Sequence, residues 1–377
     1  MRNRMLSWLL VLFIAQGLAN AREFRGVWVA TVHNIDWPSA RGLPAATQKA
    51  QLLAILDRAV ELKLTAILLQ VRPMSDALYD SPNEPWSQFL SGRQGVSPGY
   101  DPLEFAIVEA HRRGLELHAW VNPFRAASDA SSALDQRHVA KRHPEWVRRF
   151  GAQLWLDPGE PAAREYVIGV ISDIVRRYAV DGVHIDDYFY PYPIKGVIFP
   201  DEASWTRFGL TSGLSRDDWR RENINDFVRS MYRRVKEIKP GVQVGISPFG
   251  IWRPGVPPTI EAQLDAYGQL YADSRKWLRE GWCDYMAPQL YWSIEPAKQS
   301  FPFLLEWWRA QSHGTPVWPG IATERIGASR PAQEIVDEIA LTRRGTDAPG
   351  HIHWSMKALM TNQGGIDNRL REIYGRE

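Results

Sequence analysis

Two adjacent carboxylates, Asp186 and Asp187, stand at the end of a short apolar run and are followed at once by three aromatic residues. Paired carboxylates can divide acid and base chemistry between them when their surroundings hold one protonated and the other ionised. The competing interpretation is a solvated turn after a buried strand. The choice between the two depends on where this strand lies in the fold.

A third acid, Glu324, follows another apolar run at 316–323. Cleavage of a glycosidic bond needs a proton donor at the leaving oxygen and a second carboxylate at the sugar. We therefore predict Glu324 as the general acid, Asp186 as nucleophile or stabiliser of the transition state, and Asp187 as its second carboxylate. A surface ion pair between Glu324 and the adjacent Arg325 is the structural alternative.

Aromatic residues are frequent, with 17 tryptophans among 377 residues. Tryptophan is an ordinary core residue, but indole rings beside polar groups also suit the stacking of sugars. Many of these rings, and several polar side chains, lie at or near the ends of apolar runs. The predicted substrate-binding residues are Trp28, His33, Arg72, His118, Trp120, Asn122, His184, Tyr188, Gln289, Tyr291, Trp292, Trp318 and Trp354.

Short β-branched or aromatic runs alternate with segments of helical periodicity along the whole chain. The predicted strands are 24–31, 64–71, 115–122, 182–189, 243–250, 283–292, 316–323 and 351–356. The predicted helices are 47–62, 102–113, 161–178, 217–238, 262–280, 303–311, 331–344 and 367–374. Eight such pairs predict an α/β fold, a single-domain (β/α)8 TIM barrel over residues 22–377. A doubly wound sheet is the alternative, but no Gly-x-Gly-x-x-Gly motif follows the first strand.

Barrel enzymes place their chemistry at the carboxyl ends of the strands, where Asp186 is expected. Side chains alternate across a strand, so Val183 and Ile185 face the helices while His184 and Asp186 face the barrel axis. Asp187 has the opposite parity, yet a loop can turn it toward the mouth. The same alternation collects many polar residues inside a barrel that aliphatic side chains usually fill, which favours function over a purely structural hydrogen-bond network.

Other chemistries have weaker support in the sequence. No Gly-x-Ser-x-Gly elbow is present, and Ser247 lacks the second glycine that this motif requires. The single cysteine, Cys283, begins a strand and so lies away from the expected site. We expect no cofactor and no metal. Metal-dependent hydrolysis remains an alternative through His33, His118, His184 and His353 with Asp186, and so does a non-catalytic sugar-binding barrel.

The first 21 residues resemble a secretory signal peptide, with Arg2 and Arg4 before an apolar run and the small residues Ala19 and Ala21 at its end. We expect its cleavage to leave no membrane anchor and a periplasmic protein. Removing the two arginines from 45 basic residues balances the 43 acidic residues. Bulk charge therefore does not favour nucleic acid or an anionic membrane as a partner, and the oligomeric state stays open.

Several motifs together resemble the glycosyl hydrolase-like 10 family of bacterial envelope proteins. They are FRGVWVATVHNIDWPS, QVRPMSDALYDS, HAWVNPFR, DGVHIDDYFYPYP, DWRRENINDFV, GISPFGIWRP and DYMAPQLYW, in this order along the chain. The resemblance implies a TIM-barrel glycosidase, with peptidoglycan strands stripped of their stem peptides as the best precedent for a substrate. The substrate we expect is accordingly a glycan that contains N-acetylhexosamine.

The stretch around Asp186 is also similar to the chitinase pattern Asp-Gly-x-Asp-x-Asp-x-Glu. Asp181, Gly182 and Asp186 match, whereas His184 and Tyr188 stand where that pattern has an aspartate and its acidic proton donor. A proton donor must then come from elsewhere, as from Glu324. Assistance by the N-acetyl group of the substrate, oriented by one of the two aspartates, is a second option. We further expect the segment 191–215 to form a flap over the site.

Overall fold

The computed structural model describes residues 23–295, 298–327 and 330–375. The predicted signal peptide lies outside these residues. Among the described residues, no helix combines the length and the apolar character that a membrane crossing requires.

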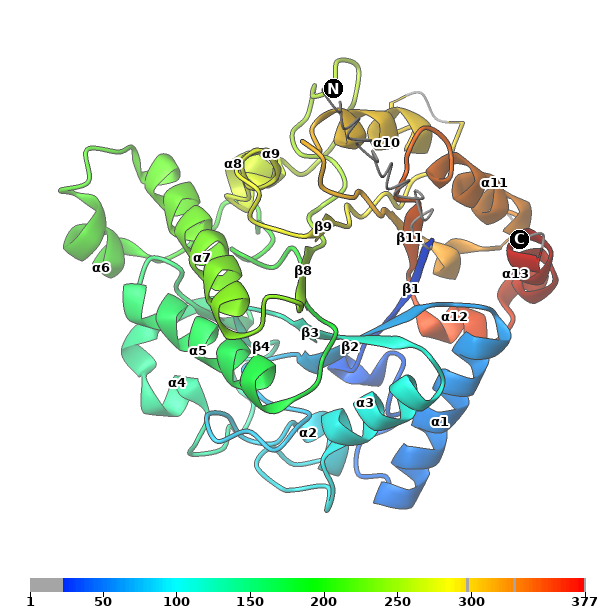
Figure 1. Cartoon of the computed structure of the whole chain (residues 1–377). Coiled ribbons are helices and arrows are strands. Elements are labelled where there is room, and N and C mark those ends of the chain that lie inside the picture. Colours follow the sequence, from blue (N-terminus) through cyan, green and yellow to red (C-terminus); the bar gives the residue numbers. More distant parts are fainter. Residues whose placement is uncertain (1–22, 296–297, 328–329, 376–377) are drawn as a thin grey trace, which may run out of the picture.

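The centre of the fold is a curled sheet of eight parallel strands surrounded by helices (Figure 1). Its strands are β1 (Phe24–Val29), β2 (Ala66–Arg72), β3 (Glu116–Val121), β7 (Gly182–Ile185), β8 (Gln243–Ile246), β9 (Tyr285–Met286), β10 (Gly320–Ile321) and β11 (Gly350–His353). The order in the sheet is β10-β11-β1-β2-β3-β7-β8-β9. The first and last strands in the chain, β1 and β11, are therefore neighbours in the sheet, which is not the case in a doubly wound sheet. All eight predicted strands are confirmed.

The two edge strands of this sheet, β9 and β10, are linked by isolated contacts rather than by a continuous ladder. The Met286 amide donates to the Pro316 carbonyl at 2.9 Å, and the Trp318 amide donates to the Met286 carbonyl at 2.9 Å. A further parallel bridge joins Gln289 to Gly320. The edges of the curled sheet thus lie side by side.

Helices follow most strands and form the outer layer (Figure 1). The longer ones are α1 (Ala45–Glu61), α3 (Pro102–Arg112), α5 (Pro161–Arg177), α7 (Arg216–Ile238), α10 (Phe301–Ala310), α11 (Ala332–Thr342) and α13 (Ile366–Gly375). Local sequence explains their starts. The Asp101 carboxylate accepts a hydrogen bond from the Glu104 amide, and the Ser215 hydroxyl accepts one from the Asp218 amide, so each caps an otherwise unpaired donor.

Shorter elements complete the chain. They are α2 (Gln88–Ser91), α4 (Val139–Arg142), α6 (Glu202–Ser204), α8 (Ala266–Gln269), α9 (Ser274–Arg279), α12 (Met356–Met360) and a small antiparallel sheet of β4 (Arg125–Ala127), β6 (Gln153–Leu156) and β5 (Val147–Phe150). The prediction of one helix over 262–280 was wrong. Tyr271 has φ +55°, which a helix does not tolerate, and Asp273 then caps α9.

The sheet separates two apolar cores, as the alternation of side chains predicts. Leu117, Ala119, Val183 and Ile185 pack between sheet and helices. A second cluster fills the interior of the curled sheet, with Phe24, Trp28, Ala66, Leu68, Trp120, Tyr285, Ala287, Trp318 and Ile352 among its members.

Glycines in the strands make room for the large interior rings. A β-carbon on Gly245 would lie 1.9 Å from the Tyr285 ring, and one on Gly182 would lie 2.4 Å from His118. Both distances are shorter than any real contact, so these positions admit only glycine while the rings stay in place. The aromatic filling of the interior therefore depends on small residues in neighbouring strands.

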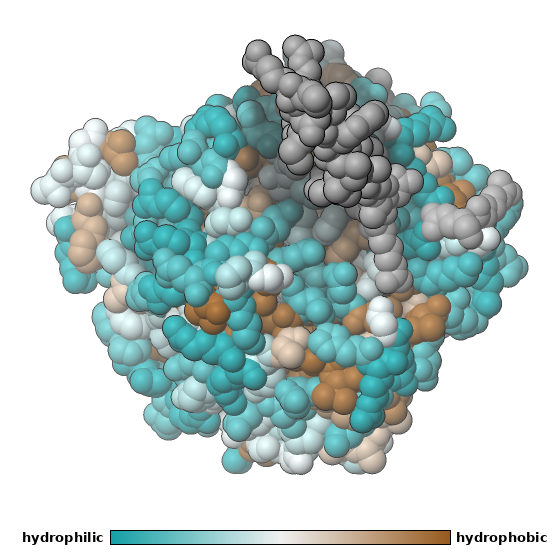
Figure 2. Space-filling model, in the orientation of Figure 1, coloured by the Kyte–Doolittle hydropathy of each residue, from teal (hydrophilic) through white to brown (hydrophobic). Residues whose placement is uncertain are grey.

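The face of the molecule in Figure 2 is mostly hydrophilic, with small scattered apolar patches. Across the described residues, six of the twelve exposed large hydrophobic side chains fall in the segment that follows β7. They are Tyr192, Ile194, Val197, Ile198, Leu210 and Leu214. Exposed apolar side chains gathered in one segment are a frequent mark of a binding surface.

Candidate active site

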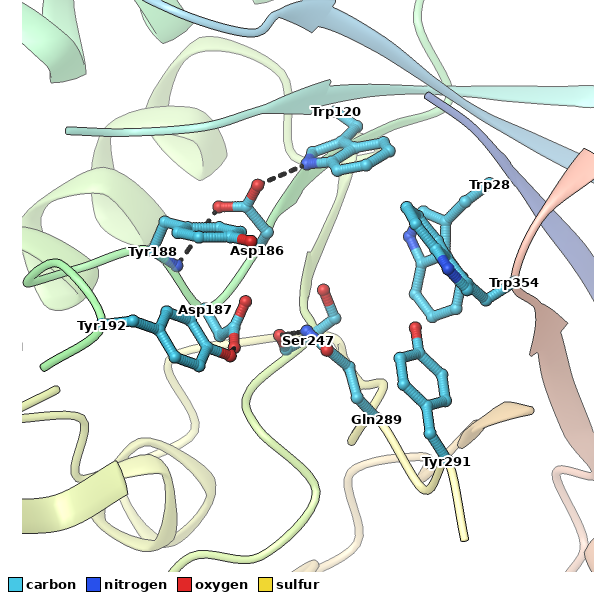
Figure 3. Close-up of a pocket in the computed structure, with 10 residues that line it drawn as sticks. All are labelled: Trp28, Trp120, Asp186, Asp187, Tyr188, Tyr192, Ser247, Gln289, Tyr291 and Trp354. Atoms are coloured by element: carbon cyan, nitrogen blue, oxygen red, sulfur yellow. Dashed lines mark hydrogen bonds between the residues drawn. The ribbon is translucent and has the colours of Figure 1, made fainter. Parts of the chain in front are cut away.

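A pocket of about 210 Å³ lies at the carboxyl ends of the strands (Figure 3). It is lined by Trp28, Trp120, Asp186, Asp187, Tyr188, Tyr192, Ser247, Gln289, Tyr291 and Trp354. In Figure 3 the two aspartates stand on one side and face the rings of Trp28, Tyr291 and Trp354 on the other. The site thus has an acidic wall and an aromatic wall.

Asp186 follows β7 directly and is held by donors from β3 and the residue after it. The Trp120 indole N–H donates to its Oδ2 at 3.0 Å, and the Asn122 amide donates to the same oxygen at 3.1 Å. The backbone amide of Tyr188 approaches Oδ1 at 3.4 Å. Oδ1 is therefore the oxygen that can carry a proton.

Asp187 lies in the same pocket although its position in the strand has the opposite parity. The Tyr192 hydroxyl donates to its Oδ2, and the Gln289 amide also interacts with its carboxylate. The chain turns after β7, and this turn brings the second carboxylate to the mouth beside the first. The two adjacent acids of the sequence are therefore both pocket residues.

Burial dominates the electrostatics of the pair. It raises the pKa of Asp186 to about 7, while the positive charge of Arg125 opposes the rise and the negative charge of Asp187 adds to it. Burial also raises the pKa of Asp187, although the hydrogen bonds from Tyr192 and Gln289 favour its ionised form. Two buried like charges at one site disfavour double ionisation, so the pair retains a proton near neutral pH.

Rings from three different parts of the sheet form the aromatic wall. Trp28 lies in β1, Trp354 directly follows β11, and Tyr291 lies in the chain after β9. The Trp354 ring lies 6.0 Å from Trp28 with edge-to-face geometry and 6.5 Å from Tyr291. Burial and the charges of Asp187 and Glu324 raise the pKa of Tyr291 well above its ordinary value, so its hydroxyl remains a donor.

His184 holds the aromatic wall in place through Trp28. The Trp28 indole N–H donates to His184 Nε2 at 3.2 Å, and the Ser247 hydroxyl lies 2.9 Å from the same nitrogen. His184 is fully buried and contacts no pocket space. It therefore supports two pocket residues, Trp28 and Ser247.

Several predicted substrate-binding residues lie outside the pocket lining. His118 and Trp318 lie inside the curled sheet, where they pack around Phe24 and Tyr285. Arg72 is fully buried and forms an ion pair with Glu84 at 2.6 Å. These three side chains hold the fold around the site. Asn122 contacts Asp186 directly although it does not line the pocket.

Glu324, His33 and Trp292 are at the edge of the site rather than in it. Glu324 lies in a short 3-10 turn after β10 and is exposed, on the side of the pocket that carries Tyr291. His33 is also exposed and packs edge-on against Phe89 at 5.5 Å. Trp292 is partly buried against Phe249. None of the three is among the residues that line the pocket.

Two pocket residues and one neighbour were not predicted. Tyr192 lies in the segment expected as a flap, and Ser247 was considered only as a nucleophile. Arg125 lies in the motif HAWVNPFR, and its guanidinium group is 4.7 Å from the centre of the Tyr188 ring. Arg125 comes three residues after Asn122, just past the end of the third predicted strand. The sequence could therefore have indicated that Arg125, like Asn122, lies near the acid pair.

The candidate metal ligands do not converge. Of the described residues, no three His, Cys, Asp or Glu side chains form a group able to hold a metal ion. His118 and His184 each bond to the Tyr285 hydroxyl, at 2.9 and 3.0 Å, and His353 bonds to Thr323 and Tyr374.

Comparison with known proteins agrees with the predicted resemblance. Residues 23–336 match the family described as Glycosyl hydrolase-like 10. Glycosyl hydrolase YngK of Bacillus subtilis strain 168 is 42% identical over 376 residues, which cover 95% of this chain and 74% of YngK. Glycosyl hydrolase DigH of Escherichia coli strain K12 is 34% identical over 330 residues, which cover 82% of this chain and 75% of DigH.

The fold has a counterpart among solved structures. The glycoside hydrolase domain of PgaB (BpsB) from Bordetella bronchiseptica has a TM-score of 0.59 and 14% identity, covering 93% of this chain and 98% of that domain. This likeness shows the fold alone. The family description and the names of both relatives support a glycoside hydrolase. The chain belongs to the glycosyl hydrolase-like 10 family.

Proposed function

We propose that this protein is a periplasmic glycoside hydrolase that cleaves a glycan containing N-acetylhexosamine, with peptidoglycan strands freed of their stem peptides as the substrate. One observation carries the proposal: Asp186 and Asp187 are buried together in a pocket whose opposite wall is aromatic. Carboxylates and stacking rings on opposite sides suit a pyranose held between them.

The geometry favours Asp186 as the proton donor. Its pKa of about 7 keeps a large fraction protonated near neutral pH, and a general acid works best when its pKa is near the working pH. The proton on Oδ1 would pass to the glycosidic oxygen as the bond to the anomeric carbon breaks. Water would then add to this carbon and return a proton to Asp186. Glu324, predicted from the sequence for this role, is exposed at the edge.

Asp187 then supplies the negative charge. Donors from Tyr192 and Gln289 orient its carboxylate, which would stabilise the positive charge that develops on the sugar ring in the transition state. The same carboxylate could instead orient the N-acetyl group of the substrate so that its carbonyl oxygen attacks the anomeric carbon. Both routes need Asp187 ionised while Asp186 is protonated.

We also propose that the curled sheet is a closed (β/α)8 barrel over residues 22–377. The hydrogen bonds between the β9 and β10 segments support closure, since they place the two sheet edges in parallel contact. In such a barrel the catalytic groups come from the ends of several strands. Asp186, Trp120, Trp28 and Trp354 belong to four different strand ends, as this arrangement requires.

The test is mass spectrometry of products from peptidoglycan strands, intact and amidase-stripped, incubated with the purified protein and three variants. We expect Asp186→Asn and Asp187→Asn each to lose activity by about 10²- to 10⁴-fold, because each removes one half of the acid–base pair. Glu324→Gln should retain activity within about threefold, since Glu324 lies outside the pocket.

The other outcomes identify the competing functions. Loss of activity in Glu324→Gln with retention in Asp186→Asn would return the acid role to Glu324. Loss on addition of EDTA to the wild-type protein alone would indicate a metal-dependent hydrolase. Intact strands in every sample, with the strands bound to the protein, would indicate a sugar-binding barrel without catalysis.

A further inference from the structure

Arg125 differs from the other buried arginines of the described residues because it forms no ion pair. Five arginines are buried, and four of them, Arg25, Arg72, Arg220 and Arg330, form ion pairs with carboxylates. Arg125 is 9% exposed, and no described carboxylate lies within ion-pair distance of it. Its one side-chain hydrogen bond to the backbone runs from Nε to the Pro73 carbonyl at 3.3 Å.

A buried guanidinium group without a carboxylate costs free energy, and such groups are normally paired. Arg125 keeps its charge beside the pocket, because its guanidinium carbon is 4.7 Å from the centre of the Tyr188 ring and Tyr188 lines the pocket. Asp186 and Asp187 act on it only through space. The Arg125 side chain also interacts with the Tyr188 hydroxyl, but no described carboxylate pairs with the guanidinium group directly. A carboxylate on a ligand would supply this direct partner.

A second guanidinium group, that of Arg41, lies near His33 in the segment that follows β1. Arg41 lies over one face of the Phe89 ring at 4.8 Å, and His33 packs against the same ring. Burial lowers the pKa of His33, and the positive charges of Arg125 and then Arg41 lower it further. Arg41 and Arg125, the first residue of β4, are thus both near enough for their charges to act on His33.

We propose that Arg125 binds a carboxylate carried by a substituent of the sugar in the pocket. This inference rests on the proposed function and narrows its substrate. In a peptidoglycan strand the lactyl ether of each muramic sugar bears a free carboxylate once the peptide has been removed, whereas an attached peptide converts this group into an amide. A guanidinium group binds a carboxylate in a paired geometry that an amide cannot reproduce.

The test compares two substrates that differ only in this charge. Stripped glycan strands would be used as such and after carbodiimide coupling with ammonia, which turns each lactyl carboxylate into a neutral amide. We expect the wild-type kcat/KM to be about 10- to 100-fold higher on the carboxylate form. Equal values on both substrates would overturn the inference and leave the proposed function intact.

Variants test whether Arg125 causes the preference for the carboxylate substrate. Arg125→Gln should bring the ratio of the two kcat/KM values close to one, and Arg125→Lys should keep part of the preference because it keeps the charge. Arg369→Gln, on the outer helix α13, removes an exposed arginine and should leave the ratio unchanged. If Arg125→Gln lowers both values equally and shifts the pH profile, Arg125 acts on the aspartates and the inference is wrong.

A binding measurement separates this inference from the proposed function. Calorimetry would compare N-acetylmuramic acid with its lactamide on the wild-type protein and on Arg125→Gln. Tighter binding of the acid to the wild-type protein alone supports the carboxylate site even if no strand is cleaved. Indifference of both proteins to the charge would refute it whatever the cleavage result.

Discussion

At the scale of single residues, the site keeps Asp186 in an environment that opposes its charge. Burial raises its pKa from 3.8 in the unfolded chain to about 7 in the folded protein. The folded state therefore holds the proton more tightly, so this group's contribution to stability is present below pH 4 and is lost as pH rises to about 7. The acid role proposed for Asp186 would therefore come with a loss of stability as pH rises.

Replacing Asp186 by Asn should accordingly stabilise the protein increasingly as pH rises. We expect the free energy of unfolding of Asp186→Asn, relative to wild type, to increase by up to about 3 kcal/mol between pH 5 and pH 8. Urea unfolding at both pH values measures it. Asp337→Asn, at an exposed helix position, is the control and should show no such trend. A constant difference across this range would mean that Asp186 ionises normally in the folded protein.

The sequence located the acid pair because strand alternation is regular up to the end of β7. It could not locate Tyr192 or Ser247 in the pocket, since both depend on how loops from different strands meet. The alternation that groups Glu324 with Ala322 stops at Ile321, where β10 ends and a 3-10 turn begins. The alternation of side chains along a strand therefore does not predict the direction of the Glu324 side chain.

At the scale of elements, the segment that follows β7 contributes directly to the site. Tyr192 is in this segment and donates its hydroxyl hydrogen bond to Asp187. That hydrogen bond lowers the pKa of Asp187 and so opposes the effect of burial. The segment also carries half of the exposed large hydrophobic side chains of the described residues. It is suited to cover a bound glycan, as a flap would.

Tyr192→Phe tests this contact. Without the hydroxyl the pKa of Asp187 rises, so the acid limb of the kcat/KM profile should move to higher pH, and activity at pH 5 should fall by about tenfold. Rates across pH 4–9 measure the shift. Tyr267→Phe, on α8 and outside the pocket, is the control. Unchanged profiles for both variants would show that Tyr192 does not act on Asp187.

Element positions were largely predictable, because hydrophobic periodicity and capping residues are local properties of the chain. The failures have local causes too. The antiparallel sheet of β4, β6 and β5 is built from runs of three and four residues, which are too short for periodicity to register. The predicted helix over 262–280 is interrupted by the backbone conformation of Tyr271, whose hydroxyl accepts a hydrogen bond from Arg220.

At the scale of the whole molecule, a directed chain of hydrogen bonds runs through the interior from the pocket. The Trp28 indole N–H donates to His184 Nε2, which assigns the proton of this ring to Nδ1 and lets it donate to the Tyr285 hydroxyl. Tyr285 then donates to His118 Nδ1, and His118 Nε2–H to the Glu116 carboxylate at 3.3 Å. The chain connects strands β1, β7, β9 and β3.

The α/β class and the sheet of eight parallel strands followed from the count of alternating strands and helices, but this interior chain of hydrogen bonds did not. It depends on three rings from different strands meeting at one hydroxyl group, where Gly182 and Gly245 leave room. Sequence alternation indicated only that the rings face inward. Because His184 also holds Trp28 and Ser247, the interior polar groups set the position of the pocket walls.

Tyr285→Phe should therefore affect stability and activity together. It removes one hydroxyl and leaves two buried imidazole nitrogens without a partner, at about 1–3 kcal/mol each, so the free energy of unfolding should fall by about 2–5 kcal/mol. Urea unfolding and kcat/KM would be measured on the same preparations. Tyr232→Phe, which loses one hydrogen bond of 3.2 Å to Asp284 at a partly exposed position, is the matched control and should lose less than about 1 kcal/mol. If Tyr285→Phe were as stable and as active as this control, the two histidines would not depend on the hydroxyl, and the pocket walls would be positioned by packing alone.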